Sequence, residues 1–135
     1  MSTLQAANIQ ALSSATLPVI KDSAGTEYGR FCRAFVNYDG NGGTIRASFN
    51  ISSITVNSTG KWTVNFTNAF SDANYTVVSS SGNNGSTSYT SFIGAGLSAN
   101  TTYNNKTASA CDIWALSGNN AAFIGQFDTQ LAFFR

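Results

Sequence analysis

Residues 61–67 read Lys-Trp-Thr-Val-Asn-Phe-Thr, and an apolar side chain stands at every second position of this stretch. Successive side chains of a β-strand point to opposite faces, so Trp62, Val64 and Phe66 share one face and polar residues share the other. This period of two is typical of an antiparallel strand with one buried face and one solvated face. The stretch therefore predicts such a strand, and the turn-forming Ser58-Thr59-Gly60 precedes it.

The same alternation occurs on both sides of this strand. Residues 32–38 alternate in this way, and the turn cluster Asp39-Gly40-Asn41-Gly42-Gly43 follows them. In the next segment we expect one continuous buried face made of Ile45, Ala47, Phe49 and Ile51. Short strands separated by turns at this spacing predict an all-β, antiparallel β-sandwich-like domain. Further strand candidates are residues 75–79, 89–93, 110–116, 121–127 and 130–134, with long polar loops at 80–88 and 97–109.

The first 28 residues lack this alternation. Ser2-Thr3-Leu4-Gln5 matches a helix capping box, but Pro18 ends any helix quickly. We therefore expect residues 1–28 to form an extended N-terminal docking arm, and residues 29–135 to form the sandwich-like domain. At the other terminus, Phe133 and Phe134 adjoin the final Arg135. They predict a last strand that is packed into the core or between subunits, because an unanchored terminus frays.

The composition argues against several classes of function. The 135 residues include no His and carry a net charge of +1, with only 10% charged residues. The absence of His excludes His-based triads and the usual zinc ligands, and a near-neutral chain is unsuited to nucleic acid. We find no convincing carboxylate pair, nucleophile with its base, metal set or membrane span. The sequence thus predicts a protein that is not an enzyme and has no cofactor, no metal, no nucleic-acid partner and no membrane insertion.

The two cysteines, Cys32 and Cys111, lie far apart in the sequence. We expect two unpaired thiols in a chain made in a reducing cytoplasm, since no signal peptide precedes the domain. A disulfide between them stays open, because it requires α-carbons within about 7 Å of each other.

Aromatic residues within polar segments are the best candidates for ligand contacts. Tyr103 lies in Thr101-Thr102-Tyr103-Asn104-Asn105-Lys106, with no apolar neighbour in sequence. A ring among amides and hydroxyls suits a sugar, because the ring stacks on the apolar sugar face while the amides bond its hydroxyls. Alternatively, Tyr103 packs back onto the sheet with its phenol in water. Trp114 is expected in the core or in a subunit interface. The candidate receptor-binding residues are Asn83, Asn84, Tyr89, Tyr103, Asn104, Asn105 and Lys106.

Three motifs in order carry a resemblance to a known family. The segment 25–40 includes Cys-Arg-Ala-Phe-Val-Asn-Tyr-Asp-Gly, residues 45–55 read Ile-Arg-Ala-Ser-Phe-Asn-Ile-Ser-Ser-Ile-Thr, and residues 62–75 begin Trp-Thr-Val-Asn-Phe-Thr. Over about residues 22–78 this resembles a C-terminal module of tailed-phage tail fibre and virion appendage proteins, including those of cyanophages. The module usually has Trp at the position of Phe35, and Met-Pro in place of Phe70-Ser71.

The resemblance implies a function. It implies a homotrimeric tail fibre tip of the virion, made in the host cytoplasm, with a scaffold built from the motifs and receptor contacts in the loops after Ser79. The arm would dock on another virion component, and the loops would bind host surface glycan. Two alternatives remain: a capsid cement, collar or baseplate protein that uses the module for assembly alone, and a polysaccharide depolymerase.

Overall fold

The computed structural model describes residues 19–82, 91–95, 106–117 and 128–135. In these residues every named element is a β-strand, and every strand pair is antiparallel. The chain divides into two compact units, residues 1–31 and 32–135. The prediction of an all-β, antiparallel protein is therefore confirmed. The proposed helix start at residues 2–5 lies outside the described residues.

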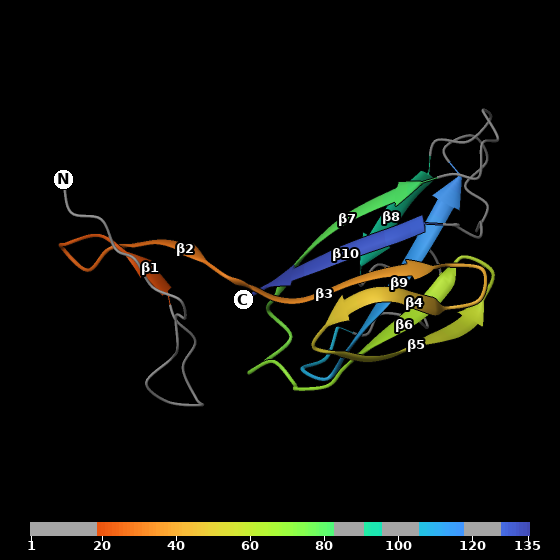
Figure 1. Cartoon of the computed structure of the whole chain (residues 1–135), viewed down its shortest axis with the longest axis horizontal. Coiled ribbons are helices and arrows are strands. Elements are labelled where there is room, and N and C mark those ends of the chain that lie inside the picture. The colour runs from red at the N-terminus through yellow and green to blue at the C-terminus, as the bar shows by residue number, and fades with distance from the viewer. Residues whose placement is uncertain (1–18, 83–90, 96–105, 118–127) are drawn as a thin grey trace. The chain divides into compact units, whose positions relative to one another are not determined.

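In its described residues, the second unit is a two-layered β-sandwich of eight strands (Figure 1). One sheet has the strand order β4-β3-β10-β7 and the other has the order β5-β6-β9-β8. The first sheet consists of β3 (Cys32–Asp39), β4 (Thr44–Phe49), β7 (Thr76–Gly82) and β10 (Asp128–Phe134). The second consists of β5 (Ile51–Ser58), β6 (Lys61–Phe66), β8 (Ser91–Ala95) and β9 (Ala110–Ser117).

These strands match most of the expected ones. The alternation at residues 32–38 and 61–66 appears as alternating burial along β3 and β6. The candidates at 110–116 and 130–134 correspond to β9 and β10. The loop expected at residues 80–88 begins later, because β7 continues through Gly82 along its partner β10. The candidate at 121–127 lies outside the described residues.

The core lies between the two sheets and is rich in aromatic side chains. At one end, Phe66 makes edge contacts with Phe70, Tyr75 and Phe133 at centroid distances of 4.7, 5.6 and 5.0 Å. Such pairs contribute about 0.5–1.5 kcal/mol each beyond their burial. At the other end, Tyr38 meets Trp62 edge-on at 5.7 Å. Each of these clusters joins residues of both sheets, so they hold the layers together.

The C-terminal strand is an interior strand of its sheet. β10 pairs with β3 on one side and with β7 on the other. Its residues Leu131 and Phe133 are buried in the core. The prediction that the last strand packs into the core is thus confirmed for Phe133, whereas Phe134 is only partly buried.

The expected buried face of Ile45, Ala47, Phe49 and Ile51 is wrong. The pairing of β3 with β4 shifts register between Asn37, which pairs with Ala47, and Tyr38, which pairs with Ile45, so β4 advances by two residues where β3 advances by one. An extra residue of this kind moves the following side chains to the other face of the sheet. Ile45 and Ile51 consequently pack against the core, while Ala47 and Phe49 are exposed.

Asn50 is the corner at which the chain leaves the first sheet and enters the second. Its φ of 57° lies in the left-handed region, which Asn tolerates better than most residues. Its side-chain amide donates to the carbonyl oxygens of Arg33 at 3.2 Å and Asn68 at 3.1 Å. Its side-chain oxygen accepts from the backbone N–H of Asn68 at 2.8 Å. One side chain therefore joins the corner to β3 and to the segment that follows β6.

A second link holds the opposite end of the sandwich. The Trp62 indole donates to the carbonyl oxygen of Gly40 at 2.7 Å, in the turn between β3 and β4. In that turn, Gly43 has a φ of 69°, and a Cβ at this position would lie 2.8 Å from Val56. The glycine-rich cluster is therefore a turn that must lie close to β5.

The described part of the first unit is a small hairpin of β1 (Val19–Lys21) and β2 (Glu27–Arg30). The Asp22 carboxylate accepts from the backbone N–H groups of Ala24 at 2.9 Å and Thr26 at 2.8 Å, and this stabilises the turn. The expectation of an extended segment is wrong for these residues, because the chain folds back on itself at Asp22.

The Asn50 corner leads to a graded prediction for stability. Asn50→Gly keeps the left-handed backbone but loses three hydrogen bonds, so we expect a loss of about 1–3 kcal/mol in the free energy of unfolding. Asn50→Ala loses the same bonds and adds backbone strain, which costs about 1 kcal/mol more. Urea unfolding measures both values. Ser48→Ala on β4 is the control. Equal stability of Asn50→Gly and Asn50→Ala would contradict a role for the left-handed backbone at this position.

The interior position of β10 predicts the effect of a truncation. Deletion of residues 131–135 removes Leu131 and Phe133 from the core and leaves β3 and β7 without their shared partner. We expect an insoluble or unfolded product, as judged by circular dichroism and solubility. Deletion of Arg135 alone removes only an ion pair with Asp72, and this should cost about 1 kcal/mol or less. A folded and soluble 131–135 deletion would refute the assignment.

Candidate interaction surface

The outer face of the sheet β4-β3-β10-β7 carries a row of apolar side chains, one from each strand. Phe35 lies between two buried residues of β3, so its side chain points away from the core. Its direct partners are Phe49 on β4 and Ala132 on β10, and Ala132 also pairs with Val78 on β7. Directly paired residues share a face of the sheet. We name this set the apolar row: Phe49, Phe35, Ala132 and Val78.

The apolar row is accessible to solvent. Phe35 is 42% exposed, and Phe49 and Val78 are each 56% exposed. The two phenylalanine rings stack with centroids 6.4 Å apart. Isolated exposed apolar residues are ordinary, but neighbouring ones that span a whole sheet indicate an interaction surface. This face is therefore the best candidate for a functional site within the described residues.

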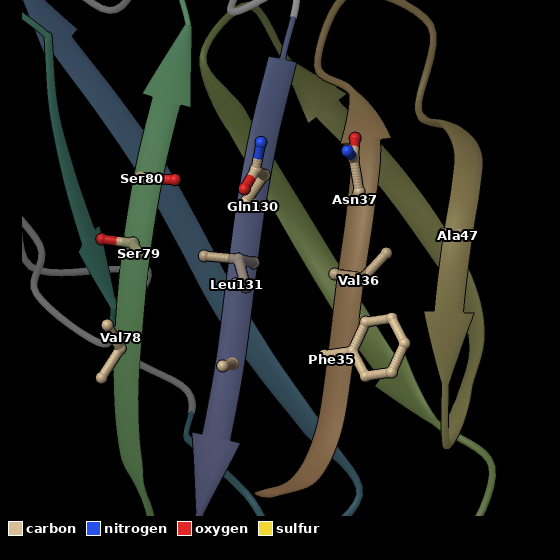
Figure 2. Close-up of a pocket in the computed structure, with 10 residues that line it drawn as sticks. Phe35, Val36, Asn37, Ala47, Val78, Ser79, Ser80, Gln130 and Leu131 are labelled. Atoms are coloured by element: carbon tan, nitrogen blue, oxygen red, sulfur yellow. The ribbon is translucent and has the colours of Figure 1, made fainter.

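Polar side chains border the apolar row on one side. Two positions further along the strands, paired residues form what we name the amide row: Ala47, Asn37, Gln130 and Ser80. The amide row and three members of the apolar row, Phe35, Ala132 and Val78, line an open groove of about 480 Å³ (Figure 2). Its floor includes the buried Val36 and Leu131 of the central strands.

Charged side chains lie beyond the amide row. The Arg46 guanidinium donates to Asp128 at 3.1 Å and to the Asn37 side-chain oxygen at 3.3 Å, and it lies 3.9 Å from Asp39. The Gln130 amide donates to Asp128 at 3.1 Å. We name Asp39, Arg46 and Asp128 the charged row. The face therefore changes from apolar to amide to charged along the strand direction.

The outer face of the other sheet differs in chemistry. The Asn57 amide donates to Thr63 at 2.9 Å, and the Thr63 hydroxyl donates to Asp112 at 2.7 Å. The Asn65 amide donates to Ser53 at 3.0 Å on the neighbouring strand. These polar groups bond one another across β5, β6 and β9. These hydroxyl, amide and carboxylate groups of the face thus have partners within the sheet.

Trp114 lies on this polar face and outside the core. It pairs directly with Lys61 and alternates with the buried Ile113 and Ala115 along β9. Its side chain is partly buried, and its indole N–H has no hydrogen-bond partner among the described residues. The expectation of a core position is therefore wrong, because Trp114 follows the outward set of the alternation. A place in a subunit interface stays a prediction.

All six carboxylates of the sequence lie in described residues, and each has a local partner. Asp22 caps the hairpin turn, Glu27 pairs with Arg30, and Asp112 accepts from Thr63. The backbone N–H of Asn74 and the Arg135 guanidinium lower the pKa of Asp72. Asp39 and Asp128 flank Arg46, as described above. Each carboxylate therefore makes a contact that supports the structure.

The predicted receptor-binding residues lie largely outside the described part of the chain. This holds for Asn83, Asn84, Tyr89, Tyr103, Asn104 and Asn105, so their role stays a prediction. Lys106 is described, and it donates to the carbonyl oxygen of Tyr75 while its ammonium lies 4.6 Å from the centre of the Tyr75 ring. Lys106 therefore anchors one end of the loop to the sandwich, and its contact with a receptor stays a prediction.

The apolar row was not predicted from the sequence, although part of the signal was present. Phe35 stands at a position that the alternation assigns to the solvated face, between Arg33 and Asn37. A phenylalanine at such a position suggests a partner. Phe49 could not be recognised in this way, because its face depends on the register shift at Arg46.

The two cysteines differ in burial, and this predicts their reactivity. Both are free thiols, Cys32 partly buried and Cys111 buried. Burial raises the pKa of the Cys111 thiol to about 11. We expect an alkylating reagent at pH 8 to modify Cys32 at least tenfold faster than Cys111, because the thiolate is the reactive form. Mass spectrometry of the intact protein and of Cys32→Ser measures this, and equal rates would contradict it.

The same pKa also gives the direction of a pH dependence. The folded state retains the Cys111 proton at a pH where the unfolded chain has lost it. Its contribution to stability is therefore complete below the ordinary thiol pKa, and is lost as the pH rises to about 11.

Comparisons with known proteins leave the chain without an assigned family. Within the described residues, no group of three His, Cys, Asp or Glu side chains could hold a metal ion, and no helix is long and apolar enough to cross a membrane. Neither a protein-family match nor a similar curated protein nor a similar solved structure is found for this chain.

Proposed function

We propose that the chain is a virion structural protein, the trimeric tip of a tail fibre of a tailed phage. In this proposal residues 1–28 dock on another virion component, and the loops at residues 80–88 and 97–109 bind glycan on the host cell surface. The chain would be made in the host cytoplasm and act as part of the virion. It is proposed to act by binding, without catalysis, metal or cofactor.

The apolar row is the observation that carries this proposal. Phe35 and Phe49 belong to the two motifs that resemble the fibre module, yet they are exposed on the sandwich. A motif that served only to fold one chain would place its aromatic residues inside. Exposed aromatic residues at these positions support a module that assembles with other chains.

The chemistry of the carboxylates supports a role in binding. A glycosidase requires two carboxyl groups about 5–10 Å apart that face a shared substrate site. In the charged row, Asp39 and Asp128 both lie beside the Arg46 guanidinium. Both carboxylates are thus engaged in ion pairs on the sheet surface. This favours the binding role over a depolymerase.

A second candidate function is a capsid cement, collar or baseplate protein. The apolar row favours it equally, because assembly alone would account for an exposed apolar face. The two functions predict different positions of these loops in the virion. Antibodies against residues 97–109 would label a free distal tip in electron micrographs of the virion if the chain is a fibre tip, and would label the capsid or baseplate if it is not.

The glycan proposal predicts the effect of a single substitution. Tyr103→Ala removes the ring that we expect to stack on a sugar, so glycan-array binding of the assembled protein should fall about 5- to 150-fold, given about 1–3 kcal/mol for an aromatic contact. Tyr28→Ala is the matched control, because Tyr28 is a 75% exposed tyrosine of the first unit. Equal binding by the Tyr103 variant and the wild type would count against the assignment of this residue.

A further inference from the structure

The apolar row is asymmetric across the sheet. Strands β4 and β3 contribute the bulky Phe49 and Phe35, whereas β10 and β7 contribute the smaller Ala132 and Val78. The half made by β4 and β3 therefore carries larger apolar side chains than the half made by β10 and β7. The groove is lined by residues of all four strands, from Ala47 on β4 to Val78 and Ser80 on β7. A surface of this kind fits the opposite half of an identical surface.

We infer that two further copies of this chain cover the outer face of the sheet β4-β3-β10-β7, around a threefold axis parallel to the strands. This inference rests on the proposed trimer and names the surface that forms it. Each copy places its Phe49 and Phe35 against Ala132 and Val78 of the next copy. The contact is head-to-tail, which closes into a ring of three.

The order of the rows favours this axis. Rotation about an axis parallel to the strands keeps every row at its own height, so apolar side chains meet apolar ones and amides meet amides. Arg46, whose side chain is 43% exposed, then lies at the height of Asp128 of the adjoining copy. A twofold axis that lies in the plane of the face and perpendicular to the strands would reverse the strands. It would bring the charged row of one copy toward the end of the sheet that carries Phe134.

The width of the sheet agrees with three copies. Four strands spaced about 4.8 Å apart form a face about 19 Å wide. Three faces of this width enclose a triangle whose sides lie about 5 Å from the axis, which is half of the ~10 Å spacing between sheets packed face to face. Phenylalanine side chains span such a distance, so the interior would be filled by side chains.

A saccharide is a less suitable occupant of this face. Sugar binding requires amides with free donors and acceptors beside the ring. Here one polar atom of each amide is already engaged, since the Asn37 oxygen accepts from Arg46 and the Gln130 nitrogen donates to Asp128. The apolar row also extends over all four strands, which exceeds the contact of one ring with one sugar. These features favour a protein surface of the same composition.

The test measures the mass of the assembled full-length chain by light scattering and sedimentation. We expect the wild type to have the mass of three chains. Phe35→Glu and Val78→Glu alter opposite halves of the face, and each should reduce the mass threefold with an unchanged circular dichroism spectrum. Thr55→Glu is the matched control, since Thr55 is exposed and, as the partner of Thr63, lies on the outer face of the other sheet. This variant should remain a trimer.

Each other result has a definite meaning. A wild-type trimer that persists in both Phe35→Glu and Val78→Glu overturns the inference and leaves the proposed trimer intact. A wild-type monomer or dimer overturns both. Loss of glycan-array binding in a Phe35→Glu variant that stays trimeric would assign the face to a saccharide and overturn the inference. A trimer that these variants dissociate, but that binds neither glycans nor host cells, supports the inference and contradicts the proposed receptor function.

Discussion

The sandwich depends on how the chain passes from one sheet to the other at Asn50. β4 ends at Phe49 and β5 begins at Ile51, so a single residue makes the change of sheet. Such a short connection needs a left-handed backbone and leaves nearby backbone groups without ladder partners. The Asn50 side chain bonds three of those groups, on Arg33 and Asn68. The corner sets β4 and β5 beside each other, and their hairpin partners β3 and β6 then follow as facing central strands.

The corner also explains which part of the fold could be predicted. Local alternation along β3 and β6 was sufficient to assign their buried faces, because these strands are central and straight. The run from Ile45 to Ile51 shows the same alternation but was assigned wrongly. The burial of each residue in this run depends on a register shift at Arg46 and on a change of sheet at Asn50. Both features arise from pairing with other strands. Phe133 could be placed because a terminus needs an anchor. The exposed position of Phe35 could be recognised only once the burial of its neighbours on β3 was known.

The two outer faces show how a chain with few charges divides its polar groups. On the sheet with β6 and β9, hydroxyls and amides bond one another between strands, so this face needs only water as its neighbour. On the sheet with β3 and β10, the amides bond to the charged row at one end, and the apolar row is left without polar cover. The difference between the two outer faces is therefore determined by the outward-facing residues of each strand. The two sheets can share one core in spite of this difference.

The shortage of charge links this asymmetry to function. Each of the six carboxylates is used within its own unit to cap a turn, to pair with a cation or to hold a strand. Recognition of a partner must then come from neutral groups: aromatic rings, methyl groups, amides and hydroxyls. Contacts of this kind are short-ranged and depend little on salt, because they involve no net charge to be screened. Each of them is weak, so useful affinity requires several copies that act together. In the proposed function, an exposed apolar face that joins copies and neutral loops that bind weakly would therefore be two parts of one solution.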